Sequence, residues 1–395
     1  MKLLQVIPSY LPGRCFGSPI RRVHGLSKAL VERGHEVHVW TTDRGESEQL
    51  DVSCGERREF DGVRVRYFAV RGPGRLRYAP GLRRALRERA FEFDLIHAHG
   101  LFQAPTSLAL RAAQAAGVPA VLSPQGMLQR EFLEARGRWG KRLWLRAIDR
   151  PALRGVTGVH LTSDLEQSGL VGLSPSSEQL LLLPSGVDRE AFDGDWSAVE
   201  DSVAELCAEH SEVVLFLGRI RRGAGLELLA EALAGLPGDA HLVVAGPDEG
   251  GRASFEARVR ELGLTGRVTL AGVLGGTTLS ALLEHARCLA LPAQSDCSGD
   301  VALEAMAIGT PPIVTPWVSA AEWVRRGAGL VVPAEPGRWR AALGGMLADS
   351  GRREKFAARG RELAREEAAW PSLAAHFESA YLRWTTGPSS ESQAA

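Results

Sequence analysis

Apolar positions along the chain alternate between short continuous runs and segments with helical spacing. Residues 2–8 form an apolar run that predicts a strand, and residues 21–33 follow with their apolar side chains on one helical face. Gly34 ends this helix, and residues 36–41 form the next apolar run. A strand, a helix and a second strand in this order predict a βαβ unit and therefore a parallel sheet.

The alternation continues through the first half of the chain. Apolar runs predict further strands at residues 63–70, 93–100, 119–123, 156–162 and 180–183. Helical spacing predicts helices at residues 82–91, 105–117, 136–154 and 164–170. Because ligands of open α/β sheets bind at the carboxyl ends of the strands, we expect these strand ends to converge. The ends are Pro8, His97–His99, Ser123 and Thr162.

A second β/α series follows a segment without regular apolar pattern, residues 189–210, which predicts a linker. Strands are predicted at residues 213–217, 241–245, 268–270, 288–291 and 312–315. Helices are predicted at 226–233, after Asp248 up to Leu262, and at 301–309, 352–365 and 373–384. The pattern therefore predicts an α/β protein with domains at residues 1–188 and 211–368 and a last helical segment at 369–385. The Ser/Gln/Ala-rich residues 386–395 predict a disordered tail.

Composition narrows the class of protein. Lys+Arg and Asp+Glu both number 47, and this balance argues against a dedicated nucleic-acid binder. No apolar run reaches the length of a membrane-spanning helix, and the N-terminus has the pattern of a buried strand rather than of a signal peptide. The five cysteines are odd in number and lack C-x-x-C spacing, which favours a reducing cytoplasm over a disulfide or zinc framework.

The stretch from Leu291 to Trp317 carries the strongest candidate chemistry. A loop of small polar residues leads into a helix from about Val301, and two acids, Asp296 and Glu304, stand with seven residues between them. A loop whose backbone N–H groups lead into a helix N-terminus can bind an anion. The acid inside the helix can accept hydrogen bonds from sugar hydroxyls. The alternative interpretation is an ordinary crossover with two solvated acids.

Two other groups have open interpretations. His97 and His99 have no carboxylate at metal-ligand spacing, so we expect structural or acceptor-side roles and no metal site. The segment 136–154 is strongly basic, with Trp139 and Trp144 among its cations. It is either a solvated helix face or a surface that docks on anionic lipid headgroups.

Eight segments in order resemble the retaining, metal-independent glycosyltransferases of the GT-B fold, specifically glycosyltransferase family 4. They are RGHEVHVWTT (33–42), FDLIHAHGL (93–101), SPQGML (123–128), LTSDLE (161–166), LPSGVD (183–188), LFLGRI (215–220), AGPD (245–248) and LEAMAIGTPPIVT (303–315). Each segment alone is weak, but their order and spacing are specific for the fold. Within the family, the GML segment followed by a basic Trp-containing helix is similar to transferases of bacterial surface-polysaccharide assembly.

The resemblance implies two Rossmann-like domains facing a central cleft, with the C-terminal helix crossing back to the N-terminal domain. The first domain would bind a glycan or lipid-linked acceptor, and the second a nucleoside-diphosphate sugar as donor. The reaction would be a hexosyl transfer with retention, without a metal or other cofactor. The protein would be cytoplasmic, or peripheral at the inner face of the cell membrane through residues 136–154.

The resemblance also implies roles for individual residues. Arg219 would pair with the diphosphate, Glu304 would hold the ribose, and Asp296 would lie near the donor sugar. The expected catalytic residues are Asp296, Gln125 and Arg219. The expected donor-binding residues are Gly17, Ser18, Gly218, Arg219, Arg222, Ser298, Gly299, Asp300, Val301 and Glu304. The expected acceptor-side residues are His99, Gln125 and Ser185.

Five positions depart from the family pattern. Ser18 replaces a glycine, Gln125 a histidine, Ser185 an asparagine, Ala224 a lysine and Asp296 a glutamate. Arg221 or Arg222 is placed to supply part of the lost lysine charge. Three functions therefore stay open: a transferase, a non-catalytic GT-B module that binds nucleotide or glycan or partners an active transferase, and a GT-B epimerase. Ala224 and Gln125 favour the non-catalytic module. The epimerase is less favoured, because the sequence shows no acid/base pair besides Asp296 and Glu304.

Overall fold

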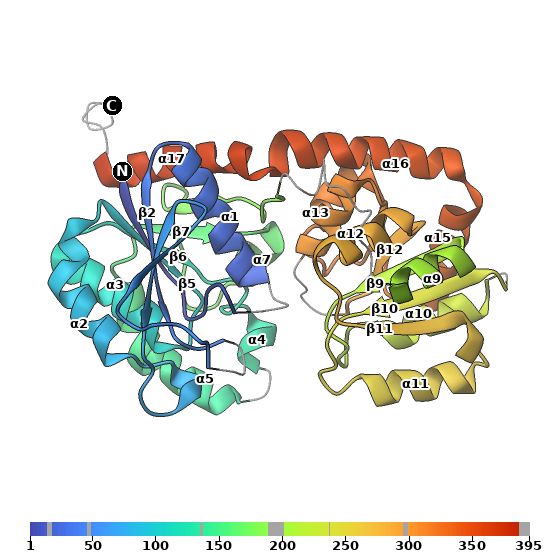
Figure 1. Cartoon of the computed structure of the whole chain (residues 1–395), viewed down its shortest axis with the longest axis horizontal. Coiled ribbons are helices and arrows are strands. Elements are labelled where there is room, and N and C mark those ends of the chain that lie inside the picture. The colour runs from blue at the N-terminus through green and yellow to red at the C-terminus, as the bar shows by residue number, and fades with distance from the viewer. Residues whose placement is uncertain are drawn as a thin grey trace. The chain divides into compact units, whose positions relative to one another are not determined.

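The structure is a computed structural model that describes residues 1–13, 18–45, 49–134, 137–188, 201–236, 238–294 and 299–386. The chain is divided into two compact α/β units (Figure 1). The first unit comprises Met1–Pro184 and the returning chain from Trp370, and the second comprises Ser185–Ala369. The expected α/β class with two parallel-sheet domains is confirmed.

The first unit is built on an eight-stranded sheet with the order β3-β4-β2-β1-β5-β6-β7-β8. The strands are β1 (Lys2–Val6), β2 (Glu36–Thr42), β3 (Arg57–Phe60), β4 (Val63–Phe68), β5 (Leu95–His99), β6 (Ala120–Ser123), β7 (Gly158–Leu161) and β8 (Leu180–Leu182). All neighbours are parallel except β3, which pairs antiparallel with β4 at the edge. Because both faces are covered, successive residues such as Leu3 and Leu4 are buried in two different cores.

Helices cover both faces of this sheet. They are α1 (Ser18–Glu32), α2 (Pro80–Arg89), α3 (Ala104–Ala116), α4 (Arg130–Glu134), α5 (Arg138–Trp144), α6 (Arg150–Leu153), α7 (Asp164–Ser168) and α17 (Trp370–Thr386), with short turns η1 (Gly74–Leu76), η2 (Ala90–Glu92) and η3 (Leu145–Asp149). Apolar residues of α2 and α3 fill one core, and those of α1 and α17 fill the other. The predicted helix at 136–154 is confirmed from Arg138 to Leu153, where α5, the π-helical turn η3 and α6 follow one another with helical backbone at both junctions.

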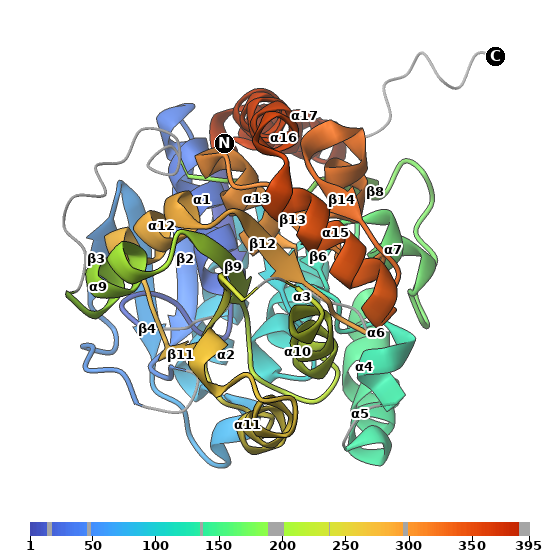
Figure 2. The same cartoon turned by 90° about the vertical axis from the view of Figure 1, so that its right-hand side faces the viewer.

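The second unit has a six-stranded parallel sheet with the order β11-β10-β9-β12-β13-β14. Its strands are β9 (Glu212–Leu217), β10 (Ala240–Ala245), β11 (Val268–Gly272), β12 (Cys288–Leu291), β13 (Pro312–Val314) and β14 (Leu330–Val331). Its helices are α9 (Asp201–Glu209), α10 (Leu226–Ala234), α11 (Arg252–Glu261), α12 (Gly276–His285), α13 (Asp300–Ile308), α14 (Ala321–Trp323), α15 (Pro336–Ala348) and α16 (Ser350–Leu363), with turns η4 (Thr265–Arg267), η5 (Val324–Ala328) and η6 (Ala364–Ala368). Helices α10 and α15 pack side by side (Figure 2).

Helix α17 returns to the first unit, as expected, and two tryptophans fix it there. Trp370 lies against Gly25 of α1, where an added Cβ would stand 2.0 Å from the indole nitrogen. Trp384 lies against Gly158 of β7, where an added Cβ would stand 2.5 Å from the ring. Glycine is therefore required at both positions for the helix to approach this closely.

Part of the predicted linker was wrong. Residues 189–200 lie outside the described residues, but residues 201–209 form helix α9. Val203 and Leu206 of this helix are buried in the core of the second unit. Two apolar residues among charges were too weak a signal to distinguish a packed helix from a linker. Among the described residues, no helix is long and apolar enough to cross a membrane.

Candidate active site

The strand order points to one edge in each unit. In the first sheet the chain runs outward from β1 through β2 on one side and through β5 on the other. In the second sheet it runs from β9 through β10 and β11 on one side, and through β12 to β14 on the other. Ligands of doubly wound sheets bind at the carboxyl ends of the strands where the order reverses. The candidate positions are therefore the ends of β1 and β5, and the ends of β9 and β12.

In the second unit, three loops at this edge are bonded to one another. The N–H of Ile220, after β9, donates to the carbonyl of Pro247, after β10, at 2.9 Å. The N–H of Gln294, after β12, donates to the carbonyl of Gly223 at 2.9 Å. These backbone bonds link the loops that follow β9, β10 and β12 into one surface.

Two glycines allow these loops their close approach. Gly225 has φ +84°, and an added Cβ would stand 2.0 Å from the carbonyl oxygen of Pro292. Gly299, at the N-terminus of α13, would bring a Cβ to 2.3 Å from the backbone nitrogen of Ala320. Its own N–H donates to Ser319 Oγ at 2.7 Å. Any side chain at either position would separate the loops, because the obstructing atoms include backbone.

The second unit places several expected donor-binding residues at this edge. Arg219 follows β9 and forms an ion pair with Glu249 of the neighbouring loop. Glu304 lies one turn into α13 and is half-buried. The others there are Gly218, Arg222, Gly299, Asp300 and Val301. Asp296, Ser298 and Gly17 lie outside the described residues, and Ser18 begins α1 with a side chain that is not described.

The position of the customary lysine is apolar. Ala224 is buried in the core formed by β9, β10 and α10, and it carries no charge. Arg221 and Arg222 stand exposed on the turn just before it. Compensation for the missing lysine would therefore come from the turn, not from position 224.

Asp248 has a structural role at the same edge. Its Oδ1 accepts hydrogen bonds from the N–H groups of Arg252 at 3.1 Å, Gly250 at 2.8 Å and Gly251 at 3.1 Å. These N–H donors lower the pKa of Asp248 because they stabilise its charged form. The carboxylate thus fixes the start of α11, which follows the loop that carries Glu249.

In the first unit, the histidines at the strand ends form a buried network. His97 Nδ1 is bonded to the Tyr381 hydroxyl of α17 and His97 Nε2 to Ser123 Oγ, both at 2.7 Å. Ser123 Oγ also contacts Nδ1 of His160 at 2.7 Å. Burial lowers the pKa of His160 to about 4 and also lowers the pKa of His97 well below its ordinary value. The network therefore consists of neutral side chains that hold α17 to the sheet.

His99 also lies inside this region. It is 3% exposed, its Nε2 is bonded to Gln5 Oε1 at 2.7 Å, and burial lowers its pKa to about 3. Its expected acceptor-side role stays a prediction. Ser185, another expected acceptor-side residue, is 5% exposed, and its hydroxyl has no hydrogen-bond partner among the residues that the structure describes.

The loop that carries Gln125 is held by a residue that sequence reasoning missed. Gln125 has φ +54°, a left-handed conformation that non-glycine residues rarely adopt. The neighbouring N–H of Gly126 donates to Oε1 of Glu166 at 2.5 Å. Oε2 of Glu166 accepts from the Thr162 N–H at 2.9 Å. Glu166 is 2% exposed, so this carboxylate joins the loop after β6 to the end of β7.

A sequence signal for Glu166 was available. Ser163 caps helix α7 by accepting the N–H of Glu166 at 3.1 Å. The serine and the acid three residues later form the S-x-x-E pattern of a capping box. The pattern predicts a helix start, but it does not predict that the acid reaches the Gln125 loop.

We expect Glu166→Gln to destabilise the first unit by about 1–3 kcal/mol, because an amide NH₂ would face a buried N–H donor. It should also raise the acceptor KM, since the Gln125 loop would lose its support. Thermal unfolding and steady-state kinetics measure the two effects. Asp164→Asn is the matched control, because Asp164 is an exposed acid on the same helix. Equal effects of the two substitutions would contradict this role.

Among the residues that the structure describes, no group of three or more His, Cys, Asp and Glu side chains is arranged to hold a metal ion. The cations at the candidate site are instead guanidinium groups. The chemistry that such a site supports is recognition of phosphate oxygens by arginine, backbone N–H groups and a helix N-terminus.

Comparisons with known proteins place both halves of the chain in glycosyltransferase families. Residues 17–186 match the glycosyl transferase 4-like domain, and residues 200–363 match the glycosyl transferases group 1 family. The chain is 27% identical to a D-inositol 3-phosphate glycosyltransferase of Xylanimonas cellulosilytica, over 91% of this chain and 90% of that protein.

Solved structures share the fold. The chain resembles Anabaena HepE in complex with UDP-glucose, with a TM-score of 0.71 and 20% identity over 96% of this chain and 99% of that one. It resembles WaaG, a glycosyltransferase involved in lipopolysaccharide biosynthesis, with a TM-score of 0.67 and 20% identity over 95% and 99% of the two chains. With both units matched in order, the chain belongs to the group 1 glycosyltransferases of the GT-B fold, in glycosyltransferase family 4.

Proposed function

We propose that this glycosyltransferase moves a sugar from a nucleoside-diphosphate sugar to a glycan or lipid-linked acceptor with retention of anomeric configuration. The observation that carries the proposal is the bonded set of loops after β9, β10 and β12, which brings Arg219 and the N-terminus of α13 to one edge. The UDP-glucose complex of HepE supports this class of donor. The description of WaaG supports a role in cell-surface polysaccharide biosynthesis.

The proposed mechanism is electrostatic. Arg219 and the loop N–H groups stabilise the charge that develops on the leaving diphosphate. Glu304 accepts hydrogen bonds from the ribose, and Asp296 orients the donor sugar. No metal takes part, since the guanidinium and the helix N-terminus supply the positive potential. The first unit binds the acceptor through Gln125 and His99, and Ser185 contributes from the chain that follows.

Retention and metal independence have a direct test. Proton NMR of the product early in the reaction reports the anomeric configuration before any mutarotation. We expect the configuration of the donor sugar and unchanged activity after treatment with EDTA. An inverted product would overturn the proposed stereochemistry. Loss of activity with EDTA that Mg²⁺ restores would overturn the metal-independent mechanism.

A non-catalytic GT-B module is the second candidate function. Two observations favour it: position 224 is a buried alanine, and Arg219 is already paired with Glu249. Such a module would bind nucleotide or glycan, or partner an active transferase. It differs from the first candidate in one measurable respect: it binds the donor but does not transfer the sugar, so no nucleoside diphosphate is released.

We also propose that the first unit docks on an anionic membrane surface. Trp139 and Leu143 of α5 are 72% and 69% exposed, although both are large and apolar. The guanidinium groups of Arg138 and Arg142 lie 5.5 and 5.9 Å from the Trp139 ring centroid. We define this docking stripe by its exposed residues, which recur at helical spacing: Arg138, Trp139, Arg142, Leu143, Arg146 and Arg150.

The opposite side of this helix is anchored to the first unit. Trp144 Nε1 donates to Oδ1 of the buried Asp149 at 3.1 Å, and Asp149 also accepts from Ser107 Oγ at 2.5 Å. Lys141 is engaged as well, because its ammonium donates to the Phe132 carbonyl at 2.6 Å and lies over the Phe132 ring. The stripe is therefore a rigid face that combines cations with an indole and a leucine, as interfacial helices do.

The docking stripe predicts binding to anionic vesicles that weakens with salt. Each arginine near such a surface contributes about 1 kcal/mol, so Arg142→Gln with Arg146→Gln should weaken sedimentation with phosphatidylglycerol vesicles about 30-fold. Arg252→Gln with Arg260→Gln on α11 is the control, since it removes the same charge from the second unit. Equal binding to phosphatidylcholine vesicles, or equal losses in both double variants, would contradict the proposal.

A further inference from the structure

A hollow lies in the first unit, and none of its lining residues is among those assigned to donor or acceptor. It has a volume of about 510 Å³ and opens beside β4 and α2. Arg66 and Phe68 of β4, Arg84 and Arg89 of α2, and Cys54 of the preceding loop are among its lining residues. The volume falls in the range of small-molecule pockets, roughly 300–1,000 Å³.

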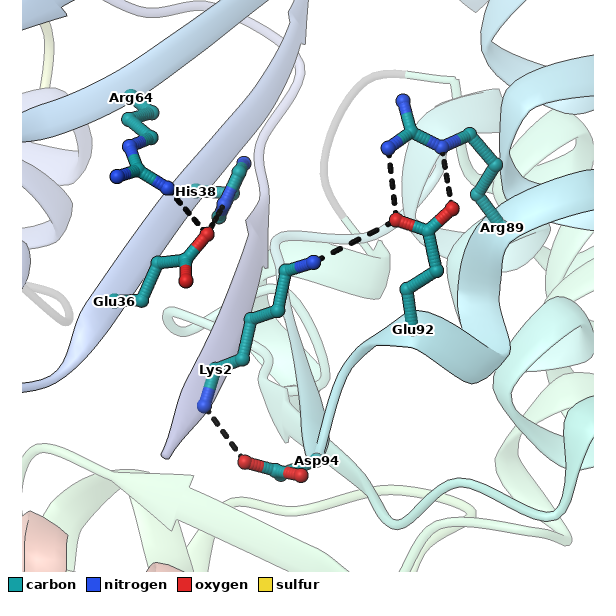
Figure 3. A network of polar contacts seen from close by, with 7 residues as sticks. All are labelled: Lys2, Glu36, His38, Arg64, Arg89, Glu92 and Asp94. Atoms are coloured by element: carbon teal, nitrogen blue, oxygen red, sulfur yellow. Dashed lines mark hydrogen bonds and ion pairs between the residues drawn. The ribbon is translucent and has the colours of Figure 1, made fainter.

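Most of the arginines around this hollow have carboxylate partners. Arg89 donates through Nε and one Nη to both oxygens of Glu92 at 2.7 Å (Figure 3). Arg64, on the adjacent part of β4, is paired with Glu36 in the same view. Arg84 is paired with Glu88 at 2.8 Å. These cations are balanced within the protein.

Arg66 differs from them. No carboxylate among the described residues pairs with it, and its Nε is buried without a hydrogen-bond acceptor. Its guanidinium carbon lies 5.1 Å from the centroid of the Phe68 ring, a cation–π contact within β4. Because this Nε has almost no accessible surface, a ligand in the hollow can reach only the terminal nitrogens of Arg66.

The sheet register adds a second unfavourable contact. Arg57 of β3 stands directly opposite Arg66 of β4 in the antiparallel pair. Like charges at opposed positions destabilise a sheet. Arg57, Arg89 and burial together lower the pKa of Arg66, because each disfavours its charged form. An anion at the terminal nitrogens of Arg66 would offset this repulsion.

We propose that this hollow binds the phosphate group of a small phosphorylated polyol or sugar, with Arg66 as its central ligand. An arginine fork matches phosphate oxygens and can bond two of them at once. The hollow is larger than one phosphate requires, and its lining offers polar and apolar surface for the rest of the molecule. The site belongs to the first unit alone and does not depend on the proposed transfer reaction.

Isothermal titration of the full chain with glucose 6-phosphate tests the proposal. We expect saturable binding that neutral glucose does not show, and a loss of at least about 10-fold in affinity for Arg66→Gln, since a charge-assisted contact is removed. Arg87→Gln is the matched control, because Arg87 is exposed on α2 and does not line the hollow. Arg66→Lys keeps the charge without the fork and should recover part of the affinity.

The outcomes separate the alternatives. In one outcome, inorganic phosphate binds the wild-type protein as tightly as glucose 6-phosphate does and fails to bind Arg66→Gln. This result would support the anion site and assign recognition to the phosphate group alone. Equal losses in Arg66→Gln and Arg87→Gln would overturn the proposal in favour of general attraction. Absence of binding in a wild-type protein with normal thermal unfolding would also overturn it. Thermal unfolding of each variant shows that the fold is retained.

Discussion

Replacing Arg219 with alanine should lower kcat/KM for the nucleotide-sugar donor about 10- to 150-fold. The expected loss corresponds to one charge-assisted contact, about 1.5–3 kcal/mol. Most of it should fall on kcat, because the diphosphate carries more charge in the transition state than in the bound donor. Steady-state kinetics at varied donor concentration separates the two constants.

Two further variants show whether the loss belongs to the donor site. Arg252→Ala removes an arginine of the same unit that is also paired with a glutamate, Glu256, and it should leave the kinetics unchanged. Glu249→Gln frees Arg219 from its partner in the structure and should keep or improve the donor KM. A role for Arg219 in folding alone would be indicated if Arg219→Ala and Arg252→Ala lowered kcat/KM equally.

Replacing Trp384 with alanine should destabilise the first unit by about 3–5 kcal/mol, the usual cost of emptying a buried tryptophan site. The indole packs on Gly158, and its Nε1 donates to the Glu178 carbonyl at 3.1 Å. Gly158→Ala should also destabilise the unit, because the new Cβ would overlap this ring. Both changes should release α17 from the sheet.

Differential scanning calorimetry measures this effect on the transition of the first unit. Trp139→Ala is the control, since it removes an indole that is 72% exposed rather than 8%. Its cost should stay within about 0.5 kcal/mol, as for most surface substitutions. Similar shifts for Trp139→Ala and Trp384→Ala would mean that α17 is not held by its tryptophans.

The alternation of apolar runs and helical spacing predicted both parallel sheets, because strands buried on both faces leave continuous apolar runs. The return of the last helix was predicted through the resemblance, but its cause is in Gly25 and Gly158. Neither glycine stands out in the sequence, since its function depends on a tryptophan more than 200 residues away. Contacts between distant segments leave no local pattern.

The candidate site was predicted unevenly for the same reason. Arg219 follows strand β9, and Glu304 lies one turn into helix α13, so the place of each at the sheet edge follows from the local sequence pattern. Glu166 does not, because its carboxylate bonds a loop 40 residues earlier in the chain. The strand β3 was missed because an edge strand with the sequence RREF has no apolar alternation. Arg66 opposite Arg57 could be recognised only once that strand was known.

The central claim is that the bonded loops of the second unit support sugar transfer and not only nucleotide binding. Release of nucleoside diphosphate from a panel of nucleotide sugars, with and without glycan acceptors, tests it most directly. We expect turnover with at least one donor and a loss of about 10-fold or more in Glu304→Ala, which removes the proposed ribose contact. Saturable binding of a donor by the wild-type protein, with no turnover of any donor in the panel, would contradict the claim and establish the non-catalytic function.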